Sequence, residues 1–568
     1  MNKMTGSAII AQAFIKEAVK TIFGYPGGAA LNIYDELYAV KDFTHVLVAH
    51  EQAAVHAADG FARASGEVGV ALVTSGPGFT NTVTALATAY MDSIPLVLIS
   101  AQVPNSLIGT DAFQEIDAVG ISRPCVKHNY LVKNIKDLSG VLKEAFYLAR
   151  SGRPGPVHID VPKDVTAELA EFSYPDEVKM KTYNPTYQGN QKQIKRLAQA
   201  LCTAKQPLFY LGGGCLEASR TLRELIKLTQ VPAINTLMAL GTLDHEDALN
   251  LKMAGMHGSY ASNMALSECD LLIAFGARFD DRVTGKTSEF AKAAKIAHID
   301  IDPSSISKII KADFPIVGSV KHVAAALLEE VRALKGKLPD FKPWHEVLAN
   351  YAKLNPLDYE THKKDAALKP QWVIEEISRF EAKSDKDFII STDVGQHQMW
   401  VAQFYPFKKP RRLITSGGLG TMGFGLPAAM GAAFACKDCV SINISGDGGI
   451  LMNIQELVTL AKTKTKVISV ILNNSYLGMV RQWQTRFYDN RLSQVDLSWQ
   501  PDFVKLAQGF DALGFHVKSE QEFIKAFAQA LESPKSSLIN VEIDRAEDVL
   551  PMVPAGAPIY NMILRGRQ

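Results

Sequence analysis

The regular alternation of short apolar runs with helical patterns constrains the fold of this chain most strongly. Runs such as "VGVALVTSGPG", "DLLIAFGARFD" and "CVSINISGDGG" lead into glycines and alternate with amphipathic or small-residue helical stretches. Three series of such alternating patterns follow one another along the chain. This pattern is typical of open parallel sheets. We therefore predict an α/β protein with three doubly wound open parallel-sheet domains. Ligands of such domains bind at the carboxyl ends of the strands.

Each predicted domain contains a series of strand patterns. A polar stretch separates each domain from the next. The domains are expected at residues 1–170, 190–332 and 371–548, followed by a tail at 549–568. The expected strands are "TIFGYPGG", "FTHVLVA", "VGVALVTSGPG", "IPLVLIS" and "GPVHIDVP", then "PLFYLGGG", "VPAINT", "DLLIAFGARFD", "IAHIDIDP" and "FPIVGS", then "FIISTDVG", "RRLITSGGLG", "CVSINISGDGG", "KVISVILNN" and "SSLINVEID".

Composition points to small-molecule partners. The net charge of +1 provides no field for steering the protein onto nucleic acid or an acidic membrane. Apolar runs are too short to span a bilayer, and the N-terminus lacks the layout of a signal peptide, so a cytoplasmic location is expected. The cysteines are expected to be buried small side chains rather than zinc ligands, including the CxxC pair; they are Cys125, Cys202, Cys215, Cys269, Cys436 and Cys439.

The stretch "SINISGDGGILMN" places Asp447 among glycines at the end of a predicted strand. Glycine loops at strand ends favour phosphate groups, which would repel a carboxylate unless a cation lies between them. Mg²⁺ prefers carboxylate and phosphate oxygens. One β-α-β unit later, Asn473 and Asn474 follow the next strand, where an amide oxygen can serve as a further ligand. A dinucleotide fingerprint is only approximated by "LGGGCLEAS" and "TSGPGFTN".

This GDG segment followed by NN resembles the signature of thiamine-diphosphate enzymes. The resemblance implies that Asp447, Asn474 and the main-chain carbonyl of Tyr476 hold Mg²⁺ on the cofactor diphosphate. It also implies a glutamate near the N-terminus, and Glu51 in "VLVAHEQAAVHAADG" fits, with "VTSGPGFTN" following it. In the family this glutamate hydrogen-bonds the aminopyrimidine ring and promotes loss of the thiazolium C2 proton. On the residues alone, Glu51 could instead simply stabilise a helix N-terminus.

The whole chain is similar to the large catalytic subunit of acetohydroxyacid (acetolactate) synthases. The resemblance implies three domains, which are pyrimidine-binding, central FAD-binding and diphosphate-binding. Substrate-side or catalytic roles are implied for Glu51, Phe113, Gln114, Lys163, Met479 and Trp483, with Val480 beside them. Further thiamine-diphosphate contacts are implied for Gly28, Asn81, Gln396, His397, Gly420, Met422, Gly446, Gly448, Gly449, Tyr476 and Gly478. On its own, Trp483 could be an ordinary core aromatic.

The flavin rests on the resemblance alone, because "RFDDR" could also be a solvated, salt-bridged loop. The implied FAD contacts are Arg153, Met256, His257, Gly258, Gly276, Ala277, Arg278, Phe279, Asp280, Arg282, Asp300 and Asp302. The flavin is expected to be structural, since the implied reaction is a carboligation without net redox change. Flavin-free catabolic acetolactate synthases typically lack "FDDRV".

The family resemblance implies decarboxylation of pyruvate and condensation of the two-carbon unit with a second 2-keto acid in branched-chain amino-acid biosynthesis. The cofactors would be thiamine diphosphate, Mg²⁺ and FAD. Sites shared between subunits imply a homodimer or larger assembly, and a separate regulatory small subunit is expected. The alternatives are a pyruvate oxidase with redox-active FAD, a glyoxylate carboligase, which the presence of Glu51 disfavours, and a non-catalytic homologue that has kept the fold.

Overall fold

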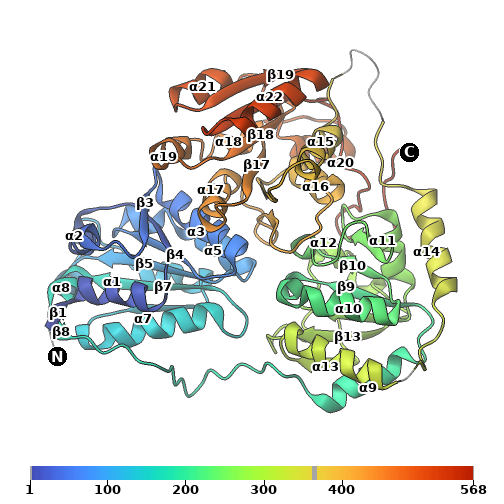
Figure 1. The fold of residues 1–568 in the computed structure, drawn as a ribbon, viewed down its shortest axis with the longest axis horizontal. Coiled ribbons are helices and arrows are strands. Elements are labelled where there is room, and N and C mark those ends of the chain that lie inside the picture. Colours follow the sequence, from blue (N-terminus) through green and yellow to red (C-terminus); the bar gives the residue numbers. More distant parts are fainter. Residues whose placement is uncertain (1–2, 335, 361–366, 567–568) are drawn as a thin grey trace. The chain divides into compact units, whose positions relative to one another are not determined.

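Three six-stranded sheets form the framework of the protein in a computed structural model that describes residues 3–334, 336–360 and 367–566 (Figure 1). Neighbouring strands in these sheets run parallel, and helices cover them. The predicted α/β fold with three parallel sheets is confirmed. A short antiparallel pair, β1 (Lys3–Thr5) with β8 (Leu169–Glu171), stands apart from the three sheets.

The first sheet has the order β3-β2-β4-β5-β7-β6. Its strands are β2 (Thr21–Gly24), β3 (Thr44–Leu47), β4 (Gly69–Val73), β5 (Leu96–Gln102), β6 (His128–Leu131) and β7 (Pro156–Pro162). Its helices are α1 (Gly6–Lys16), α2 (Leu31–Ala39), α3 (Glu51–Ser65), α4 (Pro77–Thr80), α5 (Val83–Met91), α6 (Ala118–Ser122), α7 (Ile135–Arg150) and α8 (Lys163–Ala167). Side chains of β4 alternate between two cores: Val70 and Leu72 pack with α1 and α7, and Ala71 and Val73 with α3 and α5.

The second sheet has the order β11-β10-β9-β12-β13-β14. Its strands are β9 (Pro207–Leu211), β10 (Ala233–Asn235), β11 (Asn250–Met253), β12 (Leu271–Phe275), β13 (Lys295–Asp300) and β14 (Phe314–Val317). Helices α9 (Gln191–Leu201), α10 (Ser219–Thr229) and α13 (Val320–Ala333) contribute to one core, and α11 (Tyr260–Glu268) and α14 (Lys342–Leu354) to the other. The single turn α12 (Asp281–Thr284) lies beyond β12.

The third sheet has the order β16-β15-β17-β18-β20-β19. Its strands are β15 (Phe388–Thr392), β16 (Leu413–Ile414), β17 (Val440–Gly446), β18 (Ile468–Asn473), β19 (Leu513–Val517) and β20 (Ser537–Glu542). The helices in this part of the chain are α15 (Pro370–Ala382), α16 (Gln396–Phe404), α17 (Gly425–Ala435), α18 (Asp447–Ile450), α19 (Glu456–Thr463), α20 (Gly478–Phe487), α21 (Phe503–Gly509) and α22 (Glu520–Glu532).

The chain forms two compact units. One contains the first and third sheets, with the segments up to Tyr183, Ser384–His397 and Ile414–Arg545. The other contains the second sheet, with Asn184–Lys383, Gln398–Leu413 and the C-terminal segment from Ala546. The first and third sheets share a core, in which alanines, Val55 and Phe61 of α3 pack with Leu426, Ala429 and Met430 of α17.

One strand of each sheet was missing from the sequence prediction, and each of the three is an edge strand. They are β6 ("HNYL"), β11 ("NLKM") and β19 ("LGFHV"). Edge strands are partly exposed, so they need no continuous apolar run; β6, for example, has no fully buried residue. The predicted strands have stronger apolar patterns because most are covered on both faces.

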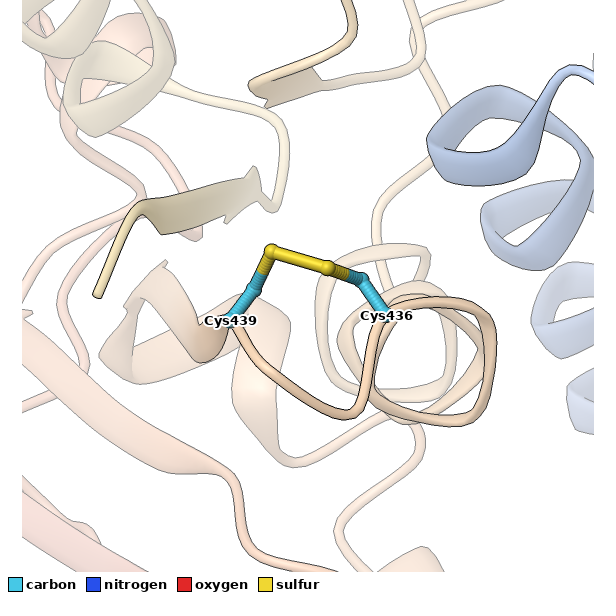
Figure 2. Close-up of a disulfide and its surroundings, with 2 residues drawn as sticks. All are labelled: Cys436 and Cys439. Carbon is cyan, nitrogen blue, oxygen red and sulfur yellow. A yellow bond between two sulfur atoms is a disulfide. The ribbon is translucent and has the colours of Figure 1, made fainter.

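The expectation that the cysteines are buried small side chains was wrong for four of the six. Cys436 and Cys439, which follow α17, form a disulfide across a Cα–Cα distance of 5.4 Å (Figure 2). The short turn at the helix end brings the two residues within the usual range for such a bond. Cys215 and Cys269 are buried as expected, whereas Cys125 and Cys202 are partly exposed. Within the described residues, no helix is long and apolar enough to cross a membrane.

Two glycines allow helices α3 and α17 to approach closely. A Cβ atom at Gly60 of α3 would collide with the carbonyl oxygen of Ala428, and one at Gly431 of α17 with that of Ala57. Only glycine fits at these positions because the two helix backbones are in contact there. The helix pair therefore fixes the distance between the first and third sheets.

We predict that Gly431→Ala lowers the free energy of unfolding by about 1 to 3 kcal/mol, because the added methyl group must push the helices apart. The matched control is Gly140→Ala on α7, where a Cβ atom would meet nothing within 4 Å. That change should stabilise the protein by up to about 1 kcal/mol, as alanine favours helix more than glycine does. Chemical denaturation of both variants measures the difference. Equal effects of the two substitutions would contradict the close helix contact.

Candidate active site

Asp447 is a buried carboxylate at the carboxyl end of β17. Its exposed fraction is 2%, and burial raises its pKa to about 7. The side-chain amide of Gln500 donates to its Oδ2 at 3.3 Å, and backbone N–H groups of Gly448 and Ser475 favour the ionised form. Burial nevertheless dominates these contacts. A cation beside Asp447 would offset this cost, so the site suits a metal ion.

Asn473 and Asn474 lie at the end of the neighbouring strand β18, and they have different contacts. Nδ2 of Asn473 donates to Gln500 Oε1 at 2.6 Å and to Asn540 Oδ1 at 2.9 Å. Nδ2 of Asn474 donates instead to Gln396 Oε1 at 3.1 Å, while its Oδ1 accepts from Tyr476 N at 3.0 Å. A carbonyl oxygen has two lone pairs, so Asn474 Oδ1 can accept a further interaction. Asn473 therefore holds neighbouring side chains in place, and Asn474 is the better candidate metal ligand.

Gln396 and His397 begin α16, next to the loops after β17 and β18. A Cβ atom at Gly446 would lie 3.1 Å from His397 Nδ1, and one at Gly478 would collide with Gln396 Oε1. A larger residue at either position would therefore have to displace the His397 or Gln396 side chain. His397 is buried, which lowers its pKa to about 4, and its Nε2 has no hydrogen-bond partner among the described residues. A buried polar atom without a partner fits a site for a polar ligand.

Met422 and the glycines near it line the same site. The Met422 methyl group would lie 3.8 Å from a Cβ atom at Gly448, while a Cβ atom at Gly449 would lie 2.8 Å from Asp393 Cγ. Gly420 has a φ of 72°, which glycine adopts without strain. Asp447, Asn474, Gln396, His397 and Met422 thus form one cluster at the carboxyl ends of β15, β17 and β18.

Glu51 is the first residue of α3, in the other sheet of the same unit. Its Oε2 accepts a hydrogen bond from Asn81 Nδ2 at 2.9 Å, and its Oε1 would lie 3.5 Å from a Cβ atom at Gly78. The carboxylate therefore faces the glycine loop "GPGFTN". Gly28 begins a short 3-10 helix, and a Cβ atom there would meet nothing within 4 Å.

Glu456 ties the start of α3 to the third sheet. This residue of α19 is fully buried, and its Oε1 accepts from Ala49 N at 3.1 Å. Burial raises its pKa to about 7, while hydrogen bonds from Thr459, Ala49 and His50 lower it. The contact lies two residues before Glu51, so it helps to fix where helix α3 begins.

The residues expected on the substrate side come from three loops or helix starts. Phe113 is 88% exposed, and Gln114 beside it has a φ of 60°. Lys163 is the first residue of α8, directly after β7. Met479 and Trp483 lie on α20; the Trp483 ring meets Phe487 edge-on at 6.1 Å, and its buried Nε1 has no partner among the described residues.

The residues expected to hold a flavin lie mostly at the carboxyl ends of β12 and β13 and beside β11. Gly276 follows β12 with a φ of 55°, and Asp300 ends β13. Met256 and Arg282 line a cavity of about 230 Å³ together with residues 553–556 of the C-terminal segment. The Phe279 side chain is buried against Tyr210, Phe290 and His298, so only its backbone is available to a ligand.

The other expected flavin residues are arranged as follows. His257 Nδ1 lies 3.2 Å from Pro551 O, and Gly258 follows it in the loop before α11. Asp280 caps α12, while Ala277 O accepts from His298 Nε2 at 2.9 Å, with Arg278 next in the chain. Asp302 N donates to Asp300 Oδ1 at 2.8 Å. Arg153 belongs to the other compact unit, where its Nε donates to Ser93 Oγ at 2.8 Å.

Known protein families match all three parts of the chain. Residues 4–121 match the thiamine pyrophosphate enzyme N-terminal TPP binding domain, residues 194–327 the central domain and residues 393–541 the C-terminal TPP binding domain. The acetolactate synthase isozyme 3 large subunit of Escherichia coli (strain K12) is 47% identical over 99% of both chains. The chain belongs to the acetolactate synthase large-subunit family.

Other members of this family are similarly close. The acetolactate synthase large subunit of Buchnera aphidicola subsp. Schizaphis graminum (strain Sg) is 44% identical over 100% of both chains. The probable acetolactate synthase large subunit of Methanocaldococcus jannaschii is 46% identical over 99% of this chain and 95% of its own length. The similarity therefore extends over all three sheets and the C-terminal segment.

Sequence reasoning missed two residues that support the site. Asp393, directly after β15, accepts hydrogen bonds from Val394 N at 2.7 Å and Gly423 N at 2.9 Å. It has the same signal as Asp447, an acid between a buried strand and a glycine, and could have been found in "STDVG". Gln500 joins Asp447 to Asn473, but no local pattern distinguishes it from other surface-type glutamines.

We predict that Asp447→Asn stabilises the ligand-free protein by about 1 kcal/mol while abolishing tight, Mg²⁺-dependent binding of thiamine diphosphate. The amide removes a buried charge, and such charges at functional sites commonly reduce stability. Thermal unfolding with a chelator present and calorimetric titration with the cofactor measure the two effects. Asp438→Asn, at an exposed position, is the control and should change neither. A less stable Asp447→Asn variant would mean that the chain itself already compensates the carboxylate.

Proposed function

We propose that this chain catalyses the acetolactate synthase reaction. It decarboxylates pyruvate and condenses the two-carbon unit with pyruvate or 2-ketobutyrate, which gives 2-acetolactate or 2-aceto-2-hydroxybutyrate for branched-chain amino-acid biosynthesis. The observation that carries the proposal is the 47% identity over 99% of both chains with an acetolactate synthase large subunit. The strand-end cluster around Asp447 and the Glu51–Asn81 pair support it.

Mg²⁺ is proposed to bind Asp447, Asn474 and the main-chain carbonyl of Tyr476. A diphosphate is proposed to bind His397, Gln396 and the loops at Gly446, Gly448, Gly449 and Gly478. Among the described residues, no three His, Cys, Asp or Glu side chains are grouped to hold a metal. A cation at Asp447 would therefore need oxygens from an amide, the backbone and a phosphorylated ligand. Thiamine diphosphate, when bound, supplies a carbon that accepts the electrons left when pyruvate loses carbon dioxide.

Glu51 is proposed to hold and move the proton that activates the cofactor. Asn81 donates to only one carboxylate oxygen, Oε2, which leaves Oε1 available to a ligand beside the glycine loop. Such a contact must be direct, because proton transfer requires hydrogen-bond distance. Thiamine diphosphate would further contact Met422, Gly420 and Gly28 in this proposal.

The substrates are proposed to contact five side chains, which are Phe113, Gln114, Lys163, Met479 and Trp483. Phe113, which is 88% exposed, and Val480, which follows Met479 on α20 and is 48% exposed, each present apolar surface that the isolated chain leaves open. The unpartnered Trp483 Nε1 supports a polar ligand group near α20. An apolar wall with few polar groups suits the ethyl group of 2-ketobutyrate.

FAD is proposed to bind the central domain without a redox role, through the residues at the ends of β12 and β13, through Met256, His257 and Gly258, and through Arg153. The cavity lined by Met256 and Arg282 supports part of this site. We also propose that the chain has three domains, at residues 1–170, 190–332 and 371–548. We further propose that the protein is cytoplasmic.

The protein is proposed to act as a homodimer or larger assembly with its sites at subunit interfaces. Tyr38, Phe113 and Trp499 are aromatic side chains with exposed fractions of 92%, 88% and 95%, which supports their burial against another copy. Because its relatives are named large subunits, we also propose a separate, smaller regulatory partner.

The proposed activity is tested by incubating the purified protein with pyruvate, with and without 2-ketobutyrate, and leaving out one cofactor at a time. We expect acetolactate in a colour assay only when thiamine diphosphate and Mg²⁺ are present, with the flavin remaining oxidised. Stoichiometric oxygen consumption with reduction of the flavin would favour the rival pyruvate oxidase. Absence of product under all conditions would indicate a non-catalytic homologue.

A further inference from the structure

A row of buried polar side chains crosses the first sheet between β5 and β7. Ser100 and Gln102 lie on β5, and His158 and Asp160 lie on β7, with Ser100 directly opposite Asp160 in the strand register. Their exposed fractions are between 0% and 3%. Burying polar groups costs free energy unless each of them is hydrogen-bonded. Four connected polar side chains in the core of a sheet therefore suggest a role beyond packing.

The hydrogen bonds of this row have one direction. Ser100 Oγ donates to Asp160 Oδ1 at 2.6 Å. A hydroxyl has a single proton, so the 2.7 Å contact between Ser100 Oγ and His158 Nε2 is donated by the ring. Burial lowers the pKa of His158 to about 3, so the ring is neutral and its Nδ1 accepts from Ser122 Oγ at 2.9 Å. Asn129 Nδ2 in turn donates to Ser122 at 2.8 Å.

Gln102 extends the row to the segment that carries Phe113 and Gln114. Its Nε2 donates to Asp160 Oδ2 at 3.0 Å and to Ile116 O at 2.9 Å, and its Oε1 accepts from Val103 N at 2.9 Å. Both ends of the amide are therefore fixed. From the other side, a Cβ atom at Gly76 would lie 2.7 Å from Gln114 O, so the backbones of these two residues are in contact.

The same row also touches the loop beside Glu51. The rings of Phe79 and His158 stack with their centroids 4.7 Å apart and an interplanar angle of 21°. Phe79 lies two residues before Asn81, which donates to Glu51. The row therefore connects the loop at Glu51 with the segment at Gln114 through side chains that are themselves shielded from solvent.

We propose that Gln102 and Asp160 are positioning residues, which hold the backbone at Ile116 and thereby place Phe113 and Gln114 against the second 2-keto acid. This inference rests on the proposed function, because it assigns the segment 113–116 to the acceptor side of the same site. Small displacements of groups that orient a substrate reduce its reaction strongly. Loss of the Gln102–Ile116 hydrogen bond should therefore change the rate of reaction with the acceptor and the choice between acceptors. It should change the affinity for the cofactor much less.

The test is Gln102→Met, which keeps the length of the side chain and removes its hydrogen bonds, assayed with pyruvate and 2-ketobutyrate together. We expect kcat/KM to fall about 10- to 100-fold. We also expect the ratio of 2-aceto-2-hydroxybutyrate to 2-acetolactate to change by about threefold or more. The dissociation constant of thiamine diphosphate should be unchanged. Ser441→Ala is the control, since it removes a buried hydrogen bond to Ala429 O at the opposite end of β17 from Asp447, and it should leave the ratio unaltered.

An unchanged product ratio, or a loss of activity that follows a loss of cofactor binding, would overturn the inference. If Gln102→Met does not fold, Gln102→Leu replaces it, because it also removes the hydrogen bonds to Asp160 and Ile116 and leaves the other side chains of the row unchanged. If neither variant folds, the row serves stability alone and the inference is wrong. A parent protein that forms neither product would instead refute the proposed function, before any variant is compared.

Discussion

The burial of the Asp447 carboxylate at a strand end is the interaction on which the rest of the site depends. A charge in that position is unfavourable by itself, and the chain supplies mainly backbone N–H groups and one long hydrogen bond from Gln500 to offset it. A cation removes the conflict, and the neighbouring features fit a cation that carries a phosphorylated ligand. Asn474 offers an amide oxygen, His397 an unpartnered buried nitrogen, and the glycines the space for a ligand close to the backbone.

The second constraint is the close packing of α3 against α17. Gly60 and Gly431 let the two helices touch, and their core contains residues from both the first and the third sheet. Because Glu51 begins α3 and Glu456 binds the backbone just before it, the position of that catalytic candidate is linked to the sheet that carries Asp447. Packing far from any ligand thus contributes to the placement of both Glu51 and the strand-end cluster around Asp447.

Much of this arrangement could be predicted from the sequence because its signals are local. Strands buried on both faces leave apolar runs, and the acid and asparagines at the ends of β17 and β18 are visible as "GDG" and "NN". The edge strands β6, β11 and β19 lack that signal. Gln500 and the row from Asn129 to Gln102 could not be predicted either, since their partners are brought together only by the packing of strands distant in sequence. The disulfide between Cys436 and Cys439 depends on how the chain turns after α17.

Exchange of the C2 proton of bound thiamine diphosphate for deuterium tests the central claim most directly. In Glu51→Gln, the site built around Asp447 is retained and the carboxylate that promotes loss of the proton is replaced by an amide. The account predicts normal folding and cofactor binding with exchange slowed by about 10²-fold or more. Glu67→Gln, at an exposed position just beyond the other end of α3, should exchange at the parent rate. An unchanged rate in Glu51→Gln would contradict the account.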